Sequence, residues 1–500
     1  MDTRSLIDKA KFRKLNDNRN ASTTSLCDLP EVVLLHILSF LPSKDVVRTS
    51  ALSKRWEQLW ISVPKLDFND KEFSQRLRFI NFVERTFLLH GLSPVKGFSL
   101  SCSIHYNKSR INAWITSAIR RNVEKLRLCL DVDKRAAVSY RLPCCVFRCE
   151  TLTELHVEMS RHIRLTSSVC LMKLKALTLV RIDFGDDNSV EKLLSGPSLE
   201  KLSLDNCMWW KLKALRISAP KLLSLSIVEL EFCTDFKCDC RVFIIGTSLE
   251  SFYYHGECAY DYTLSSSSAL VKAAISVDHP FDEKSYQFSY HGYKLLKDVA
   301  NVRDLTLSYD GLQDLNESKN FLDSLPIFAN LKKLELNMYR ACLESRALQT
   351  ILSKSSCLES LRFLSGVLVE SGTDEGIRDP VPWCFPSSLR EITIRNFHED
   401  DDQLLAVRVM LRTARVLEKI VIHRSEYYLG SSTEKLMERL REIPKASRIG
   451  DSILQFIRKV IYPVCTLEMK GQYLRNVIQL LAHEASIKWF WLRKISYRIE

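Results

Sequence analysis

The side chains best suited to chemistry in this sequence are cysteines and histidines near residue 240. Cys233, Cys238 and Cys240 are followed by His255 and Cys258, and thiolate and imidazole groups are ligands that zinc prefers. Zinc sites ordinarily contain paired Cys-x2–4-Cys or His-x3–5-His units. The spacing here is Cys-x4-Cys-x-Cys followed by His-x2-Cys, which does not follow that pattern. We therefore expect buried thiols at these positions and no metal site.

Motifs of the common enzyme classes are absent from the sequence. It contains no Gly-x-Ser-x-Gly, His-Glu-x-x-His, P-loop or Rossmann glycine pattern. The acidic run from His398 to Asp402 has no nucleophile or metal-ligand spacing beside it. No cysteine is marked as an activated thiol by its neighbours. We expect no catalytic residues and no cofactor.

The length and composition are those of a folded protein without a membrane span. At about 100–200 residues per domain, a chain of 500 residues holds several folding units. Hydrophobic residues make up 46% and charged residues 26%, as in soluble globular proteins. No run of about 18 uncharged apolar residues occurs, as a membrane-spanning helix requires, and the N-terminus lacks the apolar segment of a secretory signal. An intracellular protein with no membrane partner is expected.

The cysteine content and the charge indicate the surroundings of the protein. Sixteen cysteines without a secretory signal favour a reducing compartment with free thiols, including a second group at Cys144, Cys145 and Cys149. The net charge of +12 is spread along the chain, with no run of five or more like charges. We expect a mildly basic surface. Nucleic-acid binding is disfavoured because clustered arginines with stacking aromatic residues are missing.

Residues 26–68 are expected to fold into three short helices. Asp28 is placed to cap the first helix, with Pro30 in its first turn, and Pro42 ends it. Its apolar residues follow at helical spacing and are Val33, Leu34, Ile37, Leu38 and Leu41. A second short helix follows, and a third carries Trp56. Helices of this length hide only a small core, so an apolar face is left for a partner.

From about residue 120 to 425 the sequence repeats a short unit, apolar-x-x-apolar-x-apolar. The twelve units begin at Val123, Leu152, Leu174, Leu199, Leu222, Leu249, Leu270, Val302, Leu331, Leu358, Leu389 and Leu417. The eleven steps from the first to the last average about 27 residues, within the range of leucine-rich repeats. One such unit is common by chance, but twelve at a near-constant spacing are not. They predict an irregular solenoid with a curved parallel sheet.

Two details refine the repeat prediction. The unit at Leu199 extends to Cys207, which stands at the asparagine/cysteine position of a leucine-rich repeat. A further match, Leu212-x-x-Leu215-x-Ile217, falls in the middle of a repeat. We interpret it as a second strand on the opposite side of the same turn.

Alternate side chains of a strand point to opposite faces, so the second and third apolar residues of each unit enter the core. The residues beside them are expected on an outward, concave face and include Glu154, His156, Glu158, Lys201, Ser203, Asp205, Asp304, Thr306, Ser308, Lys333, Glu335, Asn337, Glu391, Thr393 and Arg395. This mixed polar strip is interpreted as a protein-binding surface. The candidates for substrate contact are His156, Lys201, Asp205, Lys333, Glu335 and Arg395.

The ends of the chain are expected to differ from its repeats. Residues 1–25 are polar and are predicted to be a flexible segment, and residues 69–381 form the repeat domain. Residues 382–450 are predicted to form a β-α-β-α cap over the open end of the solenoid, with Leu436 and Leu440 in its second helix. Residues 451–500 contain apolar residues at helical spacing, among them Ile453, Phe456, Ile457 and Val460. They are expected to form a helical or poorly ordered tail.

Residues 26–66 resemble the F-box. The matching residues are the Leu29-Pro30 opening, the apolar run Val33, Leu34, Ile37 and Leu38, then Leu41-Pro42, and Ser53-Lys54-Arg55-Trp56 with Trp60. With the irregular repeats and the C-terminal unit, the chain is similar to plant F-box/LRR proteins with an FBD domain. Pro444-Lys445-Ala446-Ser447 matches the Pro-(Arg/Lys)-x-Ser segment of that domain, but the cysteine-containing strand that follows in the family has no counterpart at 448–451.

The resemblance implies a substrate-receptor subunit of an SCF-type cullin-RING E3 ubiquitin ligase. The F-box would bind a Skp-type adaptor, which connects it to cullin and RING subunits, while the repeats would hold an unidentified protein substrate. Carried over by position, the adaptor contact or its supporting core comprises Leu29, Pro30, Val33, Leu34, Ile37, Leu38 and Trp56.

Two other functions remain alternatives. The chain could be a non-catalytic LRR protein that binds a protein or RNA outside ubiquitination, or an adaptor-bound scaffold outside the ligase. Both the nucleus and the cytoplasm are expected compartments.

Overall fold

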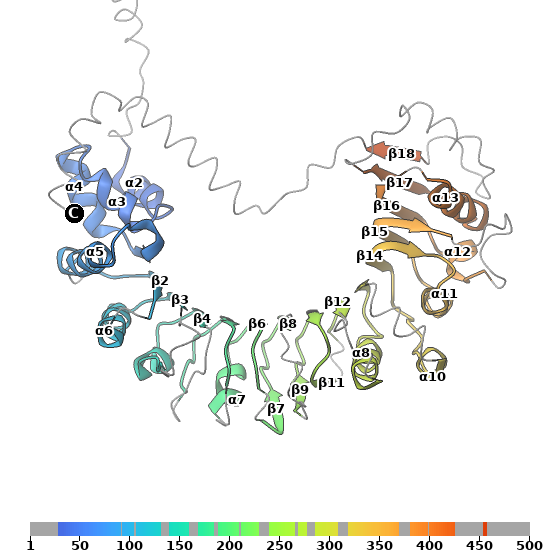
Figure 1. The fold of residues 1–500 in the computed structure, drawn as a ribbon, viewed down its shortest axis with the longest axis horizontal. Coiled ribbons are helices and arrows are strands. Elements are labelled where there is room, and N and C mark those ends of the chain that lie inside the picture. The colour runs from blue at the N-terminus through green and yellow to red at the C-terminus, as the bar shows by residue number, and fades with distance from the viewer. Residues whose placement is uncertain are drawn as a thin grey trace, which may run out of the picture.

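The computed structural model describes residues 29–425 and 454–457, except for positions 92, 105–106, 132–139, 160–168, 185–188, 210–211, 230–239, 266–268, 278–285, 309–318, 370–380 and 399. The described chain forms an open arc, with the first helices at one end and the last strands at the other (Figure 1). Strands line the inner side of the arc, and helices lie along its outer side (Figure 1).

Three short helices begin the described chain: α2 (Glu31–Leu38), α3 (Ser43–Thr49) and α4 (Lys54–Leu59), followed by the 3-10 turn η3 (Trp60–Ser62). Pro30 and Pro42 stand directly before α2 and α3, where the missing backbone N–H costs little. The three helices share a separate core formed by Leu34, Leu38, Val46, Val47, Trp56, Leu59, Trp60 and Val63. The three predicted helices are confirmed, while the predicted cap Asp28 lies outside the described residues.

The body of the molecule is one fifteen-stranded parallel sheet. Its strands in spatial order are β1 (Lys65–Asn69), β2 (Gly97–Ser103), β3 (Lys125–Asp131), β4 (Glu154–Met159), β5 (Ala176–Val180), β6 (Lys201–Asp205), β8 (Ser224–Glu229), β10 (Ser251–Gly256), β12 (Lys272–Val277), β13 (Asp304–Ser308), β14 (Lys333–Cys342), β15 (Ser360–Leu368), β16 (Glu391–Phe397), β17 (Lys419–Arg424) and β18 (Leu454–Ile457). The repeat unit sets the register, since Leu126 pairs with Leu155, Leu155 with Leu177, and Leu177 with Leu202. All four leucines are buried. Equal positions therefore stack into one continuous core, as a solenoid requires.

The sheet begins two strands earlier than the repeat pattern predicted. Strands β1 and β2 pair with each other and continue into β3. Each carries the same repeat unit, starting at Val63 for β1 and Val95 for β2, and both valines are buried. The pattern was therefore readable, because both units follow the same form and the steps from Val63 to Val95 and from Val95 to Val123, 32 and 28 residues, match those between the later repeats. Ser43 Oγ of α3 accepts a hydrogen bond of 2.6 Å from the backbone N–H of Asp67, which joins the helical unit to β1.

The predicted helical or poorly ordered tail at 451–500 is wrong at its beginning. Residues Leu454–Ile457 form strand β18, which pairs in parallel with β17. Short apolar runs do not distinguish a helix from a strand by periodicity alone. One edge of β17 pairs with β16. The backbone N–H and C=O groups of its other edge are satisfied by a neighbouring strand but not by a helix. The other residues of the tail lie outside the described part of the chain.

A second, three-stranded sheet lies on the opposite side of the central turns (Figure 1). It consists of β7 (Ala214–Ile217), β9 (Arg241–Ile245) and β11 (Asp261–Ser265). Strand β7 contains the mid-repeat match, so the predicted second strand is confirmed. Cys207 also takes the position expected for it, because its buried Sγ lies 3.4 Å from the carbonyl oxygen of Leu179 in the preceding repeat.

Helices and 3-10 turns occupy the outer side of the other turns (Figure 1). They are η4 (Asp70–Glu72), α5 (Arg76–Leu89), α6 (Lys108–Ile119), η5 (Cys144–Arg148), α7 (Ser189–Leu194), α8 (Tyr286–Asp298), α10 (Lys319–Asp323), α11 (Arg346–Ser353), α12 (Cys384–Ser387) and α13 (Asp401–Thr413).

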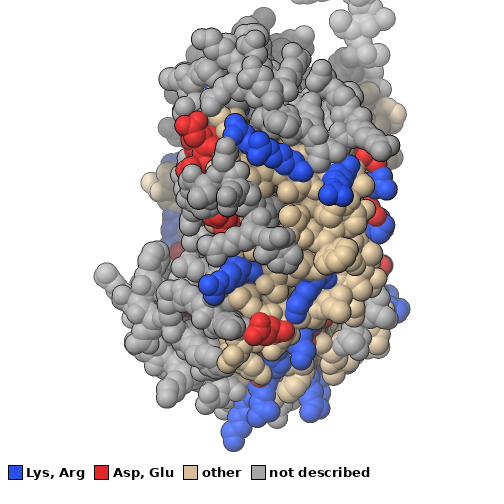
Figure 2. Space-filling model, turned by 90° about the vertical axis from the view of Figure 1, so that its right-hand side faces the viewer, with Lys and Arg blue, Asp and Glu red and all other residues tan. Residues whose placement is uncertain are grey.

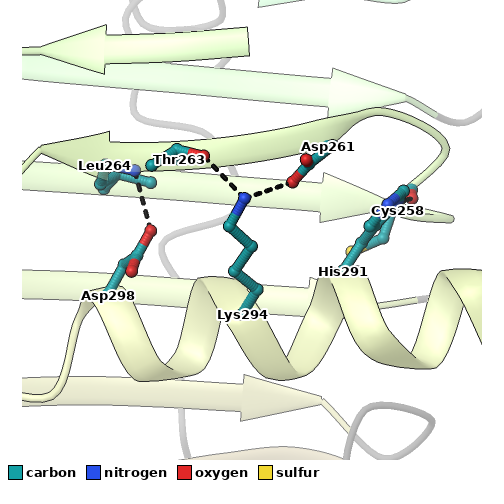
Figure 3. A network of polar contacts seen from close by, with 7 residues as sticks. All are labelled: Cys258, Asp261, Thr263, Leu264, His291, Lys294 and Asp298. Atoms are coloured by element: carbon teal, nitrogen blue, oxygen red, sulfur yellow. Dashed lines mark hydrogen bonds and ion pairs between the residues drawn. The ribbon is translucent and has the colours of Figure 1, made fainter. Parts of the chain in front are cut away.

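Polar contacts fasten helix α8 to the second sheet (Figure 3). Lys294 Nζ lies 2.5 Å from Asp261 Oδ1 and 2.7 Å from Thr263 Oγ1, both on β11. The carboxylate of Asp298 accepts a 2.9 Å hydrogen bond from the backbone N–H of Leu264. These contacts hold α8 against β11, and we assign them a role in stabilising the fold.

At the C-terminal end, β16, α13 and β17 follow one another in β-α-β order, and their role as a cap stays a prediction. The side chain of Asp400 caps α13 by accepting a 2.9 Å hydrogen bond from the backbone N–H of Gln403. The second predicted helix, with Leu436 and Leu440, lies outside the described residues. On this end of the molecule the Lys and Arg side chains are scattered over the described surface and do not form one dense patch (Figure 2).

Candidate functional site

Helix α2 presents large apolar side chains to solvent. Val32 is 77% exposed and Val33 41%, and Phe40, just beyond the helix, is 58% exposed. Val32, His36 and Phe40 follow one another at intervals of four residues, which places them along one side of the helix. The rings of His36 and Phe40 meet edge-on with their centroids 4.9 Å apart. An apolar surface of this kind is typical of a site that another protein covers, and we call Val32, Val33, His36, Ile37 and Phe40 the α2 face.

The structure separates the seven predicted adaptor-binding residues into core and surface. The core members are Leu34, Leu38 and Trp56, which are at most 5% exposed. The surface members are Pro30 and Val33, which are exposed, and Leu29 and Ile37, which are half-buried. Sequence reasoning missed Val32 and Phe40, although their four-residue spacing from His36 is readable in the sequence.

The six predicted substrate-contact residues lie on strands of the main sheet, at positions that alternate with the core. They are His156 on β4, Lys201 and Asp205 on β6, Lys333 and Glu335 on β14, and Arg395 on β16. Between β6 and β14 the sheet passes through β8, β10, β12 and β13, which is about 24 Å at about 4.8 Å per strand. The structure therefore forms two groups from them. We call them the first concave group (His156, Lys201 and Asp205) and the second concave group (Lys333, Glu335 and Arg395).

Around the first concave group, charged side chains are already paired with one another. Glu158 Oε1 accepts a hydrogen bond of 2.6 Å from Arg181 Nη2 in an ion pair. Glu158 Oε2 lies 3.9 Å from His156 Nε2. Burial, together with the positive charge of Arg127, lowers the pKa of His156, and Glu158 opposes this effect. His156 is therefore favoured in its neutral form.

Around the second concave group, the described strands bring together arginine side chains whose Nε atoms have no hydrogen-bond partner. The Nε atoms of Arg362 and Arg395 are both buried and have no hydrogen-bond partner. Burial, with the nearby charge of Arg395, lowers the pKa of His423 on the neighbouring strand. Glu335 stands opposite Arg362 in the register of β14 and β15. This part of the concave face is therefore more basic than the first concave group.

Two of the residues expected on the concave face are buried. Ser308 is 8% exposed and Thr393 7%. The hydroxyl of Ser308 accepts a 2.9 Å hydrogen bond from the backbone N–H of Val277 and lies 3.1 Å from its carbonyl oxygen. Ser308 thus joins two neighbouring strands, and neither residue offers a contact to a partner.

The thiols near residue 240 behave as buried side chains where they are described. Cys240 and Cys258 are buried and form no disulfide with another described cysteine, and His255 lies half-buried with its Nδ1 3.3 Å from the hydroxyl of Tyr253. Cys233 and Cys238 lie outside the described residues. Of the second group, Cys144 is exposed, Cys145 half-buried and Cys149 buried, and all three are free.

A buried carboxyl group that sequence reasoning missed stands at the end of strand β8, in the interior of the solenoid. Glu229 is 3% exposed. Its Oε2 accepts a 2.8 Å hydrogen bond from the hydroxyl of Tyr254, and its Oε1 accepts one from the hydroxyl of Tyr262. Burial raises the pKa of Glu229 to about 7, although both tyrosine hydroxyls lower it. Because the group is enclosed and fully partnered by its own chain, we assign it to the fold and not to catalysis.

The raised pKa of Glu229 makes the stability of the fold depend on pH. A carboxyl whose pKa is higher in the folded state stabilises the fold fully below its ordinary pKa of 4.5 and loses this contribution as the pH rises through about 7. At 1.36 kcal/mol per pKa unit, the loss is about 3 kcal/mol. We expect the free energy of unfolding of the natural chain to fall by about this amount, relative to Glu229→Gln, between pH 4.5 and pH 8. Chemical denaturation of both proteins across that range measures it, and a difference that stays constant with pH would contradict the assignment.

No helix within the described residues is long and apolar enough to cross a membrane. The comparisons with known proteins match both parts of the chain. The family model of the F-box domain matches residues 26–68. The model described as FBD-associated F-box protein At5g56370, LRR repeats, matches residues 111–262. The first match covers the α2 face and the second covers the first concave group.

Relatives from Arabidopsis thaliana extend the similarity over most of the chain. F-box/LRR-repeat protein At3g59190 is 30% identical over 373 residues, which cover 69% of this chain and 93% of the relative. F-box/FBD/LRR-repeat protein At4g26340 is 30% identical over 370 residues, or 73% of this chain and 82% of the relative. F-box/FBD/LRR-repeat protein At1g51370 is 28% identical over 456 residues, or 88% of this chain and 98% of the relative. The helical unit, the stacked repeats and these similarities together show that the chain belongs to the F-box/FBD/LRR-repeat family of plant proteins.

Proposed function

We propose that the chain is the substrate-receptor subunit of an SCF-type cullin-RING E3 ubiquitin ligase. The observation that carries the proposal is the α2 face, an exposed apolar surface within the segment that matches the F-box domain. In this proposal residues 26–68 bind a Skp-type adaptor, residues 69–381 hold a target protein, and residues 382–450 close the end of the solenoid.

The adaptor contact is assigned to the surface members of the predicted set and to the apolar residues beside them. These are Leu29, Pro30, Val32, Val33, Ile37 and Phe40. Leu34, Leu38 and Trp56 support the contact from below, because they hold α2 against α3 and α4. Apolar anchors of this kind supply most of the affinity of a protein interface when a partner covers them.

The target contact is assigned to the concave face, at one or both concave groups. A curved parallel sheet presents side chains from many repeats to one bound protein. The receptor contributes proximity, since it holds the target near the catalytic subunits at a high effective concentration. The cullin and RING subunits, with the enzymes they recruit, perform the chemistry, and this chain needs no catalytic residue.

Reconstitution tests the proposal. The purified full-length chain is mixed with a Skp-type adaptor, a cullin and a RING subunit, and the mixture is separated by size-exclusion chromatography. We expect the four proteins to elute together in equal amounts, at salt concentrations of both 0.1 M and 0.5 M, because the contact through the α2 face is apolar. A chain that does not enter the complex, and that binds RNA in a salt-dependent manner, would instead identify a binding protein outside ubiquitination.

A further inference from the structure

Three side chains capable of binding a metal meet on the concave face, on strands β3 and β4. Cys129 pairs directly with Glu158 in the register of the two strands, and His156 lies two residues before Glu158, on the same face of β4. One ligand atom from each residue lies within 4.8 Å of the other two. All three side chains are half-buried. The three residues stand at positions 129, 156 and 158. This spacing differs from the short Cys-x2–4-Cys and His-x3–5-His units by which zinc sites are found in a sequence.

We propose that Cys129, His156 and Glu158 form a binding site for a divalent metal ion of the zinc class. Zinc binds thiolate at about 2.3 Å and imidazole nitrogen or carboxylate oxygen at about 2.0–2.2 Å. Two ligand atoms on one tetrahedral ion therefore lie about 3.3–3.8 Å apart. The separation of 3.9 Å between His156 Nε2 and Glu158 Oε2 is too long for a hydrogen bond and is close to the distance that a shared ion requires.

The Cys129 thiol interacts with Glu158 and Arg127, while the histidine nitrogen of the cluster is unpartnered. His156 Nε2 is buried and has no hydrogen-bond partner, although a buried polar atom normally has one. Arg181 Nη2 holds Glu158 Oε1 at 2.6 Å, which leaves Oε2 turned toward the histidine. An outer partner of this kind orients a metal ligand. Thiolate and carboxylate together carry two negative charges, which balance the charge of the ion.

Two features define the kind of site. Three protein ligands leave a fourth position open, as in zinc sites that bind a water molecule or an incoming group. That position faces the concave side, where a donor atom of a bound protein could complete it. Arg127 lies across from His156 in the register, and its positive charge opposes the ion. We therefore expect an affinity below that of four-ligand structural sites. The inference is independent of the proposed ligase role.

Metal titration of the full-length chain tests the site. The purified chain, stripped with a chelator, is titrated with Zn²⁺ against a chromophoric competitor, and separately with Co²⁺, whose thiolate complexes absorb in the near ultraviolet. We expect Cys129→Ser and His156→Ala each to lower the bound zinc by one equivalent per chain and to abolish the thiolate–cobalt absorption of this site. Circular dichroism checks that these variants remain folded.

Matched controls separate this cluster from other thiols. Cys170→Ser removes an exposed free cysteine, and Cys238→Ser removes a member of the cysteine group near residue 240. Both controls should retain the equivalent that Cys129→Ser loses. Arg127→Gln should raise the zinc affinity several-fold, because it removes the opposing charge. Zinc stoichiometry that is equal in the natural chain, Cys129→Ser and His156→Ala overturns the proposal, as does the absence of zinc binding to the natural chain.

Discussion

Val33→Asp will weaken the binding of a Skp-type adaptor by at least about 100-fold. Val33 is a member of the α2 face and is 41% exposed, so the substitution leaves the core of the three helices intact. In the complex, however, an aspartate at this position would be covered by apolar groups of the partner. An unpaired charge buried in an interface costs about 3–5 kcal/mol, and each 1.4 kcal/mol is a factor of ten in affinity. Isothermal calorimetry with the purified full-length chain and the adaptor measures the loss.

The matched control is Leu88→Asp. Leu88 is 79% exposed, and it lies on α5, outside the α2 face. It is therefore an exposed apolar residue of similar size that the proposed adaptor does not contact, and its replacement should leave the affinity unchanged. Equal binding of the adaptor by the natural chain and Val33→Asp would contradict the assigned contact. Equal weakening by Val33→Asp and Leu88→Asp would show a general effect of charge and would contradict it as well.

The solenoid could be predicted from the sequence because its signal is repeated. Each unit alternates core and surface residues, and pairs such as Leu155–Leu177 and Leu334–Leu361 repeat the same contact along the sheet. A repeated local pattern determines a repeated register when one face of each strand must be buried. The absence of repetition explains why strand β18 (Leu454–Ile457) was predicted wrongly. A single four-residue strand repeats no pattern, and its formation depends on pairing with β17, which its own sequence does not encode.

The candidate surfaces were only partly predictable, since they depend on helix rotation and on strand order. Leu34 and Val33 are adjacent and both apolar, yet Leu34 is fully buried and Val33 is exposed. Which of them faces the partner is decided by how α2 rotates against α3 and α4. Likewise, Cys129 and His156 are 27 positions apart in the sequence and meet because their strands are neighbours. Glu229 was missed for a different reason: it occupies a core position of a repeat, where an acidic residue is tolerated only through its two tyrosine partners.

The second large effect is expected at the end of strand β10, where Gly256→Ala should destabilise the fold by about 4 kcal/mol. Gly256 pairs with Glu229 across β8 and β10 and has a φ of +150°, a conformation that side chains rarely adopt. A Cβ atom at this position would lie 2.5 Å from the carbonyl oxygen of Glu229 and 2.7 Å from its Cβ. Backbone strain costs about 1–3 kcal/mol and overpacking about 1–3 kcal/mol. The clash also moves the backbone that carries the buried carboxyl group.

Two other glycines separate the causes of this loss. Gly91 has a φ of +59° and no atom within 4 Å of an added Cβ, so Gly91→Ala tests backbone strain alone and should cost about 1–2 kcal/mol. Gly196 has no such φ, and an added Cβ would lie 3.7 Å from the Cβ of Leu199, an ordinary contact, so Gly196→Ala should change little. Denaturant titrations of the three variants and the natural chain give the comparison. A loss for Gly256→Ala no larger than that for Gly91→Ala would contradict the close contact between β8 and β10. Because neighbouring repeats of a solenoid stabilise one another, the larger expected loss should appear throughout the central repeats, and amide hydrogen exchange would show it on both sides of β10.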